Sequence, residues 1–525
     1  MPGDLRKRWV APVIYGVLGL ELAVVAGFAA TYNALDFRIY MWGGHAVTHD
    51  TRLYLDLAYG HWFTYSPFAA VVFVPIATLP LAVARIGWDL ASVAALGYSL
   101  VLVLKLAGYR PSRLAIAGVT AAAMALDPVY QTLFLGQINL ILLALIVTDV
   151  WRVASGRDAG LGTGVSVGVA VAVKLTPAIF IVFFLLAGKV KSAVIAAATF
   201  LGCGLIGLIV APGASERYWE HLFYDTSRVG APYISNQSPY AAAIRIAGGA
   251  AHVGAWYVVI PFALAAVGLA AATILARHGD WLGATAVTGS TGLLVSPISW
   301  AHHWVWILPA LVVLVRSGHR VAAGLGYLLF AVAPFWYTPH SGGPREYGFH
   351  WLVTLGANCY LIAGLAFLAY MAGRAHLVMT AAPPPPGPAG QVDEAALTGV
   401  RAQPGLGVPG CSGWGWLAGA GWRAVAADGF PVGALDLAGA VGVDGQGPAQ
   451  FVQDDVVVPP AVALEVVQAG VAAVGPVLDM VGLAAGRGLI AAAGVLAPLV
   501  PQRHQPPQVQ RDVVGLGRVH PVPGL

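Results

Sequence analysis

The sequence has few charged residues. Of its 525 residues, 10% are charged and 58% are hydrophobic, and the mean hydropathy is +0.75. About a quarter of the residues of soluble domains are charged, so this composition excludes an ordinary soluble protein and indicates an all-α polytopic membrane protein. The net charge is only +4, and the basic residues stand in short clusters between apolar runs. Nucleic acid is therefore not an expected partner.

Cysteines and nucleotide-binding motifs are also scarce. The three cysteines, Cys203, Cys359 and Cys411, are far apart and fit neither a metal site nor a disulfide framework. The polar loops contain no DxD motif, and the chain has no P-loop or dinucleotide fingerprint. A metal-assisted transfer from a sugar nucleotide has no support here, and we expect no metal site and no cofactor.

Long apolar runs are what the sequence does contain. A helix needs about 20 apolar residues to cross a bilayer core. The run 9–31 follows Arg6, Lys7 and Arg8, which favours a retained first helix with a cytoplasmic N-terminus. Residues 64–81 are short and interrupted by three prolines, so they are expected to be re-entrant or interfacial. The further predicted spans are 84–104, 113–126, 138–150, 159–174, 177–188, 192–211, 254–276, 281–297, 304–316, 321–337 and 351–372.

The basic clusters orient these spans, because basic loops stay in the cytoplasm. The count of about twelve spans agrees with a cytoplasmic position for every basic cluster. The uncharged polar motifs then fall on the outer face of the plasma membrane, where we expect a periplasmic active site. The basic clusters are residues 105–113, 152–157, 189–191, 277–278, 316–320 and 374, and the outer segments are 33–63, 134–139, 174–177, 211–245, 296–304 and 338–350.

The composition changes near the end of the chain. From residue 380 to residue 525 the sequence is rich in Gly, Ala, Val and Pro and contains no lysine. Such low-complexity sequence is typical of a disordered segment. We therefore expect a transmembrane domain at 1–379 and a disordered cytoplasmic tail at 380–525, to which no function is assigned.

Asp36 is the first candidate for chemistry. It follows the first span, where a carboxylate at the membrane boundary has a pKa set by its environment and can accept a proton from a sugar hydroxyl. The alternative is an ordinary helix cap, and Asp50 and Asp56 are competing acids in the same loop. Arg38 and Tyr40, in the same segment, are candidate substrate contacts.

Amide side chains form a second group of candidates. Gln137 and Asn139 lie at the outer end of a hairpin, where they can bind a sugar or cap the next helix. Asn236 and Gln237 lie in the longest external loop among tyrosines, a composition that suits carbohydrate but is also found in any polar loop.

Three basic side chains are candidate phosphate contacts. Lys174 stands at the outer end of a span, against the positive-inside tendency, so a lipid phosphate is its natural partner and snorkelling to the headgroups is the alternative. His302 and His303 lie between tryptophans and can stabilise a departing phosphate, and Trp300 is a candidate substrate contact. An interfacial aromatic belt is the alternative interpretation of this segment. Arg345 in the last external loop is a further candidate substrate contact, which either pairs with Glu346 or approaches phosphate.

Six motifs in order carry a family resemblance. They are DFRIY, FTYSPFAA, GQIN, KLTP, SNQSP and SPISWAHHW. Together they resemble the polyprenyl-phosphate-mannose-dependent α-1,2-mannosyltransferases, glycosyltransferase family 87, which have the GT-C membrane fold. The resemblance covers the chain from residue 9 to residue 375 and leaves the tail outside. Members of this family often carry TYPPF where this chain has TYSPF, with Ser66 in place of the first proline.

The resemblance implies a reaction and a catalytic base. It implies an inverting enzyme that moves mannose from polyprenyl-phosphate-mannose to a phosphatidylinositol mannoside, and it assigns the base to Asp36. A related lipid-phosphate-sugar transferase acting on lipomannan or arabinan is the alternative. A lipid transporter would predict polar groups near the midplane and internal repeats, and neither is evident. Membrane lipids, the donor and a glycolipid acceptor are the expected partners, and the oligomeric state stays open.

Overall fold

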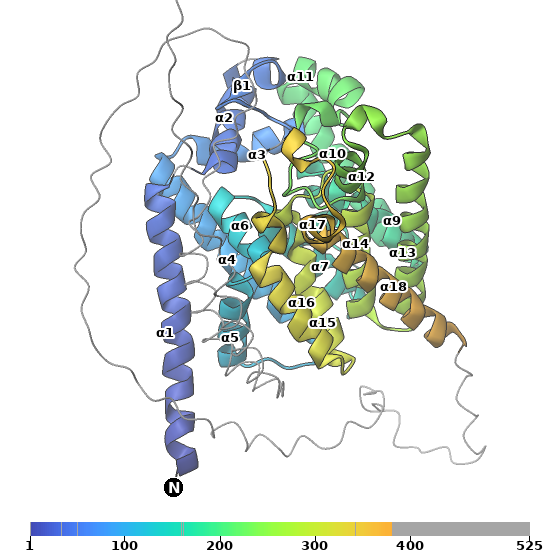
Figure 1. The fold of residues 1–525 in the computed structure, drawn as a ribbon. Helices are drawn as coiled ribbons and strands as arrows, with labels where there is room; N and C mark the ends of the chain where they lie inside the picture. The colour runs from blue at the N-terminus through green and yellow to red at the C-terminus, as the bar shows by residue number, and fades with distance from the viewer. Residues whose placement is uncertain are drawn as a thin grey trace, which may run out of the picture. The chain divides into compact units, whose positions relative to one another are not determined.

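In the computed structural model the chain is mostly helical (Figure 1). The structure describes residues 2–380 except 33, 50, 159, 161 and 342. The predicted tail therefore lies outside the described residues from 381 onward. Within the described part, the β structure is a short antiparallel hairpin of β1 (Leu57–Ala58) and β2 (His61–Trp62).

The helices differ widely in length. In chain order the α-helices are α1 (Pro2–Thr31), α2 (Leu35–His49), α3 (Pro67–Ala77), α4 (Leu81–Leu106), α5 (Arg113–Met124), α6 (Asp127–Leu135), α7 (Asn139–Ala154), α8 (Val165–Val173), α9 (Ile179–Leu186), α10 (Val190–Val210), α11 (Pro212–Arg217), α12 (Pro239–Ala247), α13 (Val259–Arg277), α14 (Trp281–Val295), α15 (Ile307–Arg316), α16 (Arg320–Val332), α17 (Trp351–Ala357) and α18 (Cys359–Thr380). Short 3-10 or π turns lie at Thr51–Tyr54, Thr176–Ala178, Tyr218–Leu222, Thr226–Arg228, Ala250–His252, Ala255–Val258, Ala301–Trp306, Pro334–Tyr337 and Pro344–Glu346.

Several helices are long and apolar enough to cross a membrane. Among the described residues these are 5 helices, or 6 if the bent pair α5 and α6 counts as one span. The chain is therefore a multi-pass membrane protein. The predicted count of about twelve spans stays a prediction, because many of its segments form shorter helices. They are shorter because polar and proline-containing breaks, such as the one at residues 174–177, interrupt the apolar runs.

Basic clusters that are distant in sequence meet through acidic side chains. Asp280 accepts hydrogen bonds from Arg316 and Arg374, the latter at 3.1 Å, and also caps α14 at the N–H of Gly283. Lys189 pairs with Asp158 at 2.9 Å. Because Arg316, Arg374 and Lys189 all come from predicted cytoplasmic clusters, these contacts agree with one common side for those loops. The short elements α2, β1, α3 and α11 gather at the end opposite the N-terminus of α1 (Figure 1).

Helix α14 is buried over nearly its whole length and packs against α13, α15 and α18. Three threonines, Thr285, Thr288 and Thr291, donate to the carbonyl four residues earlier, so their hydroxyls are satisfied inside the helix. Small residues let α13 approach closely. A Cβ added at Gly268 of α13 would lie 2.0 Å from Oγ1 of Thr291.

Because α13 and α14 approach so closely at Gly268, one added methyl group there should lower the stability of the protein. Gly268→Ala should destabilise the purified protein by about 1–3 kcal/mol, because the methyl forces α13 and α14 apart. Gly204→Ala in α10 is the matched control, since nothing lies within 4 Å of its added Cβ. Thermal unfolding in detergent should show a lower midpoint for the first variant only. Equal midpoints for both variants would contradict the packing.

Candidate active site

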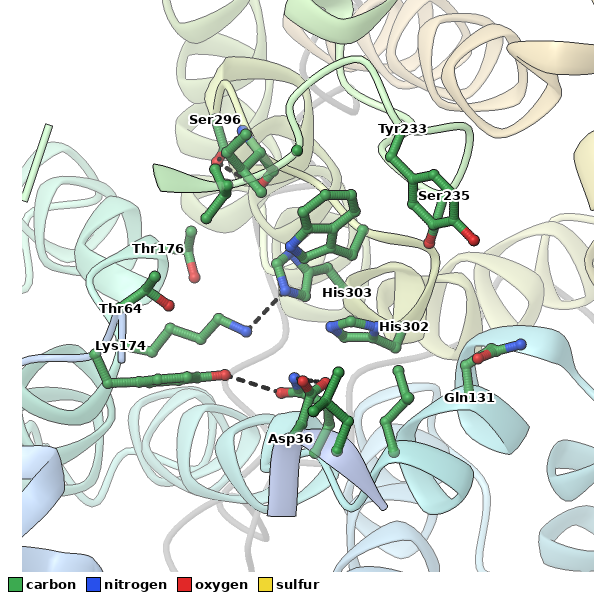
Figure 2. Close-up of a pocket in the computed structure, with 18 of the residues that line it drawn as sticks. Asp36, Thr64, Gln131, Lys174, Thr176, Tyr233, Ser235, Ser296, His302 and His303 are labelled. Atoms are coloured by element: carbon green, nitrogen blue, oxygen red, sulfur yellow. Dashed lines mark hydrogen bonds between the residues drawn. The ribbon is translucent and has the colours of Figure 1, made fainter. Parts of the chain in front are cut away.

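A single open cavity of about 890 Å³ collects most of the polar motifs. Asp36, Lys174, His302 and His303 point into it from different segments, as Figure 2 shows. These residues come from three segments that are far apart in the sequence, and the fold brings them to one cavity. The other predicted site residues that line the cavity are Tyr40, Gln137 and Trp300.

Asp36 is held by an amide. It is the second residue of α2, so it belongs to the first turn and is not the N-cap. Its Oδ2 accepts a hydrogen bond of 2.5 Å from Nε2 of Gln137. Within the described part of the chain, its Oδ1 has no hydrogen-bond partner. One oxygen is therefore fixed and the other is available to a ligand.

Two tyrosines fix the orientation of that amide. Oε1 of Gln137 accepts hydrogen bonds from the hydroxyls of Tyr40 at 2.7 Å and Tyr65 at 3.0 Å. Because the amide oxygen is occupied by these phenols, the amide nitrogen must face Asp36. The hydroxyl of Tyr40 has no direct bond to Asp36 and acts through Gln137.

Burial is the largest influence on Asp36 and raises the pKa of its carboxyl above the ordinary value. The hydrogen bond from Gln137 and the positive charges of His61, Lys174 and Arg85 act in the opposite direction. A carboxylate with a raised pKa is a better proton acceptor than an ordinary surface aspartate. The environment therefore suits a general base.

The turn that carries Gln137 requires glycine. Gly136 ends α6 with a φ of 69°, in the left-handed region. A Cβ there would lie 2.1 Å from Nη1 of Arg85 and 2.6 Å from Cβ of Phe37. Arg85 also donates to the Phe134 carbonyl at 3.1 Å, and Trp88 donates to the carbonyl of Gly136 at 2.9 Å. Helix α4 thus holds the turn in place.

Lys174 lies in the break between α8 and α9 in an extended conformation. Its Nζ is 3.0 Å from Oδ1 of Asn139 and 2.8 Å from Nε2 of His303. Both partners are neutral acceptors when His303 is unprotonated. Burial lowers the pKa of the Lys174 ammonium to about 7, against the charge of Asp36, which raises it. In the described residues Lys174 forms no salt bridge, so an anion in the cavity would supply its missing counter-charge.

Asn139 and Ser66 secure this arrangement. Nδ2 of Asn139 donates to the backbone carbonyl of His302 at 3.0 Å, so its amide joins Lys174 to the histidine segment. Asn139 begins α7 without capping it through its side chain. Ser66 caps α3 and its hydroxyl donates to the carbonyl of Ala172, near the end of α8. The serine that departs from the family pattern therefore fixes α8 just before Lys174.

The two histidines pack edge to face, with ring centroids 4.7 Å apart. Nε2 of His302 is buried and has no hydrogen-bond partner among the described residues, although His302 lines the cavity. Such a nitrogen is available to a ligand. Trp300 lines the cavity beside them, and the backbone of its segment is bridged to Asn236.

The two amides of the long loop do not line the cavity. Asn236 and Gln237 are fully buried. Oδ1 of Asn236 accepts from the backbone N–H of Ser299 at 2.9 Å, and Nε2 of Gln237 donates to the carbonyl of Ala357 at 2.7 Å. These side chains hold backbone segments together outside the cavity lining, and their role as substrate contacts stays a prediction.

Other polar predictions also fall outside the cavity lining. The guanidinium of Arg38 stacks on the ring of Tyr59 at 3.7 Å, and Arg345 is exposed. Neither side chain lines the cavity, and their assignment as substrate contacts stays a prediction. Of the competing acids, Asp56 pairs with Arg52 at 2.9 Å, away from the cavity, and Asp50 lies outside the described residues.

Sequence reasoning missed several residues of the cavity. Tyr65 stood in a recognised motif, but nothing in the sequence marked it as a partner of Gln137. Asp127 is followed by a proline at a helix start, a signal that suggests a cap more readily than a site. The missed residues with polar or aromatic groups include His61, Tyr65, Asp127, Gln131, Arg228, Tyr233, Ser235, Trp336 and His340.

In the described part of the chain, no group of three or more His, Cys, Asp or Glu side chains could hold a metal ion. Cys203 and Cys359 are buried free thiols, and Cys411 lies outside the described residues. Independence from metal stays a prediction.

Comparison with known proteins identifies the family. Residues 63–297 match the model of glycosyltransferase family 87. The chain is 31% identical over 420 residues, which are 73% of this chain and 96% of the relative, to the polyprenol-phosphate-mannose-dependent α-(1-2)-phosphatidylinositol mannoside mannosyltransferase of Mycobacterium tuberculosis. The chain belongs to glycosyltransferase family 87. The polyprenol-phosphate-mannose-dependent α-(1-2)-phosphatidylinositol pentamannoside mannosyltransferase of Mycolicibacterium smegmatis is 30% identical over 399 residues, 71% of this chain and 93% of the relative. No solved structure matches the chain.

Membership of family 87 confirms the resemblance drawn from the motifs. The matched region 63–297 contains Gln137 and Lys174, whereas Asp36 precedes it and His302 and His303 follow it. The cavity therefore joins groups from inside and outside the region that the family model matches.

The glycine turn generates a prediction. Gly136→Ala should lower turnover by about 10- to 100-fold, because a misplaced Gln137 no longer holds Asp36. Gly87→Ala in α4 is a suitable control, since its added Cβ meets nothing within 4 Å. Initial rates of sugar transfer by the two purified variants would be compared. A Gly136→Ala variant that folds and turns over normally would show that the turn does not position the base.

Proposed function

We propose that the protein transfers mannose from polyprenyl-phosphate-mannose to a phosphatidylinositol mannoside, forming an α-1,2 linkage with inversion. The names of the family 87 relatives support this donor and acceptor. The observation that carries the proposal is the half-buried Lys174, which has neutral partners and shares a cavity with Asp36. A donor phosphate at Lys174 would place its sugar near an oriented carboxylate.

The proposed reaction needs one base and one anion site. Asp36 takes the proton of the acceptor hydroxyl, whose oxygen attacks the anomeric carbon of β-mannose on the face opposite the phosphate. The bond from that carbon to the phosphate oxygen breaks, and polyprenyl phosphate leaves with one additional negative charge. Lys174 and the free Nε2 of His302 would stabilise this charge. Because phosphate leaves without a proton, no second carboxylic acid is required.

The same proposal includes the membrane arrangement. We propose a GT-C bundle of about twelve spans in the plasma membrane, with the cavity facing the periplasm and both the N-terminus and the tail 380–525 in the cytoplasm. The gathering of α2, α3 and α11 at the end away from the N-terminus of α1 supports this orientation (Figure 1). The donor would enter sideways with its polyprenyl chain in the lipid.

The test is transfer by the purified protein. With radiolabelled polyprenyl-phosphate-mannose and phosphatidylinositol mannosides, we expect an α-1,2-linked product from the wild type. Asp36→Asn should lower turnover by at least ~10²-fold, because the base is lost while the shape is kept. Asp56→Asn is the matched control, since Asp56 is an acid of the same loop that pairs with Arg52 and does not line the cavity.

Three results would contradict the proposal. Transfer by the purified protein from GDP-mannose alone would remove the lipid-phosphate donor. Near-normal transfer by Asp36→Asn would remove Asp36 as the base. Transfer of arabinofuranose, and not mannose, from the corresponding lipid phosphate would favour the arabinan alternative.

A second prediction concerns pH. Since the pKa of Lys174 is lowered to about 7, the empty site loses the ammonium charge as pH rises through that value. The KM for the donor should therefore rise above pH 7 by up to about tenfold per pH unit, because phosphate binding must then take up a proton. On the acid side, kcat should fall as Asp36 becomes protonated.

Lys174→Arg separates these effects. Arginine keeps its proton over this range, so the donor KM of this variant should not rise above pH 7, although its geometry differs. The fall in kcat at low pH should remain, because Asp36 is unchanged. Identical pH profiles of donor KM for the wild type and Lys174→Arg would contradict the assignment of the phosphate to Lys174.

A further inference from the structure

One face of helix α6 forms a wall of the cavity. Asp127, Tyr130, Gln131, Phe134 and Leu135 all line the cavity, and their spacing of three and four residues puts them on one side of the helix. The helix ends at Gly136, next to the Gln137 that holds Asp36. With a rise of 1.5 Å per residue, the wall extends about 13 Å from the base end to Asp127. This length exceeds one sugar ring.

The far end of this wall carries a second carboxylate. Oδ1 of Asp127 accepts from Nε1 of Trp336 at 3.0 Å, and Oδ2 accepts from the hydroxyl of Tyr360 at 3.1 Å. A carboxylate has about four acceptor positions, so room remains for hydroxyl donors. Among the described residues Asp127 has no salt-bridge partner, and Gln131 lies within hydrogen-bonding reach of it. A carboxylate beside an amide, as in Asp127 and Gln131, can bind sugar hydroxyls, whereas its negative charge would repel a phosphate.

Aromatic rings face this part of the cavity. Tyr233 lies 6.3 Å from Trp300 and 6.3 Å from Trp336, and Trp336 lies 5.8 Å from His340, measured between ring centroids. All four line the cavity. Flat apolar rings beside a few placed polar groups are what a sugar ring needs from a site.

The carboxylate end is separate from the cationic end. In Figure 2, Thr64, Thr176 and Lys174 lie on one side of His302 and His303, whereas Gln131, Tyr233 and Ser235 lie on the other. Asp36 lies between these groups. If the donor phosphate is at Lys174, the α6 side is left for the acceptor.

We propose that the α6 wall from Asp127 to Leu135, with the facing aromatic rings, is an acceptor subsite that binds the sugars preceding the one that is mannosylated. This inference rests on the proposed function and deepens it. The subsite would make the protein selective for an acceptor with at least two linked sugars. Asp127 and Gln131 would bind the second sugar.

The test uses acceptors that differ only in length. Octyl glycosides with one, two and three α-linked mannoses would be compared with the same donor. The wild type should have a kcat/KM at least about tenfold higher for the trimannoside than for the monomannoside. Asp127→Asn and Gln131→Leu should remove most of this preference by raising the trimannoside KM, with the monomannoside and donor KM unchanged.

Tyr360→Phe is the matched control. Tyr360 donates to Asp127 but does not line the cavity. If Asp127 were only structural, Asp127→Asn and Tyr360→Phe would lower the rates with all acceptors equally, and the subsite would be rejected. Gln131 is half-buried and lies on the cavity wall. Gln131→Leu therefore tests the subsite even if the Asp127 variant fails to fold.

Binding separates this inference from the function on which it rests. Thermal stabilisation of donor-free wild type by trimannoside, but not by monomannoside, and its loss in Gln131→Leu, would support the subsite even if no transfer occurred. Transfer at equal efficiency to all three acceptors would overturn the subsite and leave the mannosyltransferase intact. Absence of both transfer and stabilisation would overturn both.

Discussion

Asp36 and Lys174 face one cavity without forming an ion pair, and the rest of the site depends on that separation. Opposite charges in a medium of low dielectric attract strongly. If they met directly, the carboxylate would lose its basicity and the ammonium would be unavailable to an anion. Two neutral amides from one turn prevent this. Gln137 occupies an oxygen of Asp36, and Asn139 occupies the ammonium of Lys174.

The separation is maintained by interruptions in helices. The left-handed turn at Gly136 ends α6 and lets α7 begin at Asn139, so both amides project from one short break. A second break, after α8, exposes Lys174 to the cavity. Ser66, at the start of α3, holds the end of α8 through its hydrogen bond to the carbonyl of Ala172. Irregular backbone at membrane depth is tolerated where it lines a polar cavity. The short helices at this end are therefore what allows charged groups to be held there.

The cavity is asymmetric about the proposed base. One side has a cation with neutral partners, which suits a single phosphate, and the other has a carboxylate, an amide and aromatic rings, which suit hydroxyls and sugar faces. In the proposed mechanism both sides must be filled for Asp36 to act, because it lies between them. A water-filled acceptor side would leave the donor exposed to hydrolysis, so tight binding of the acceptor also protects the donor.

Local sequence was enough to find four ionisable residues that line the cavity, although it missed others, such as Asp127 and Arg228. Asp36, Lys174 and the paired histidines are conspicuous because an ionisable group in an apolar, outward segment has no ordinary role there. The roles of the amide and arginine side chains were harder to predict. A polar side chain has the same sequence context whether it faces a ligand or a backbone carbonyl. Asn236 and Gln237 hold loops, whereas Gln137 faces the cavity, and their local sequences do not tell these apart.

The sequence by itself determined that the chain is a multi-pass helical membrane protein, since the length and polarity of apolar runs fix that outcome locally. It also determined the family, because six motifs keep their order along the chain. Only the tertiary structure decided which polar groups meet. Asp36 and Gln137 are 101 residues apart, and Lys174 and His303 are 129 apart. Contacts over such separations depend on where helices break and pack, which no local pattern encodes.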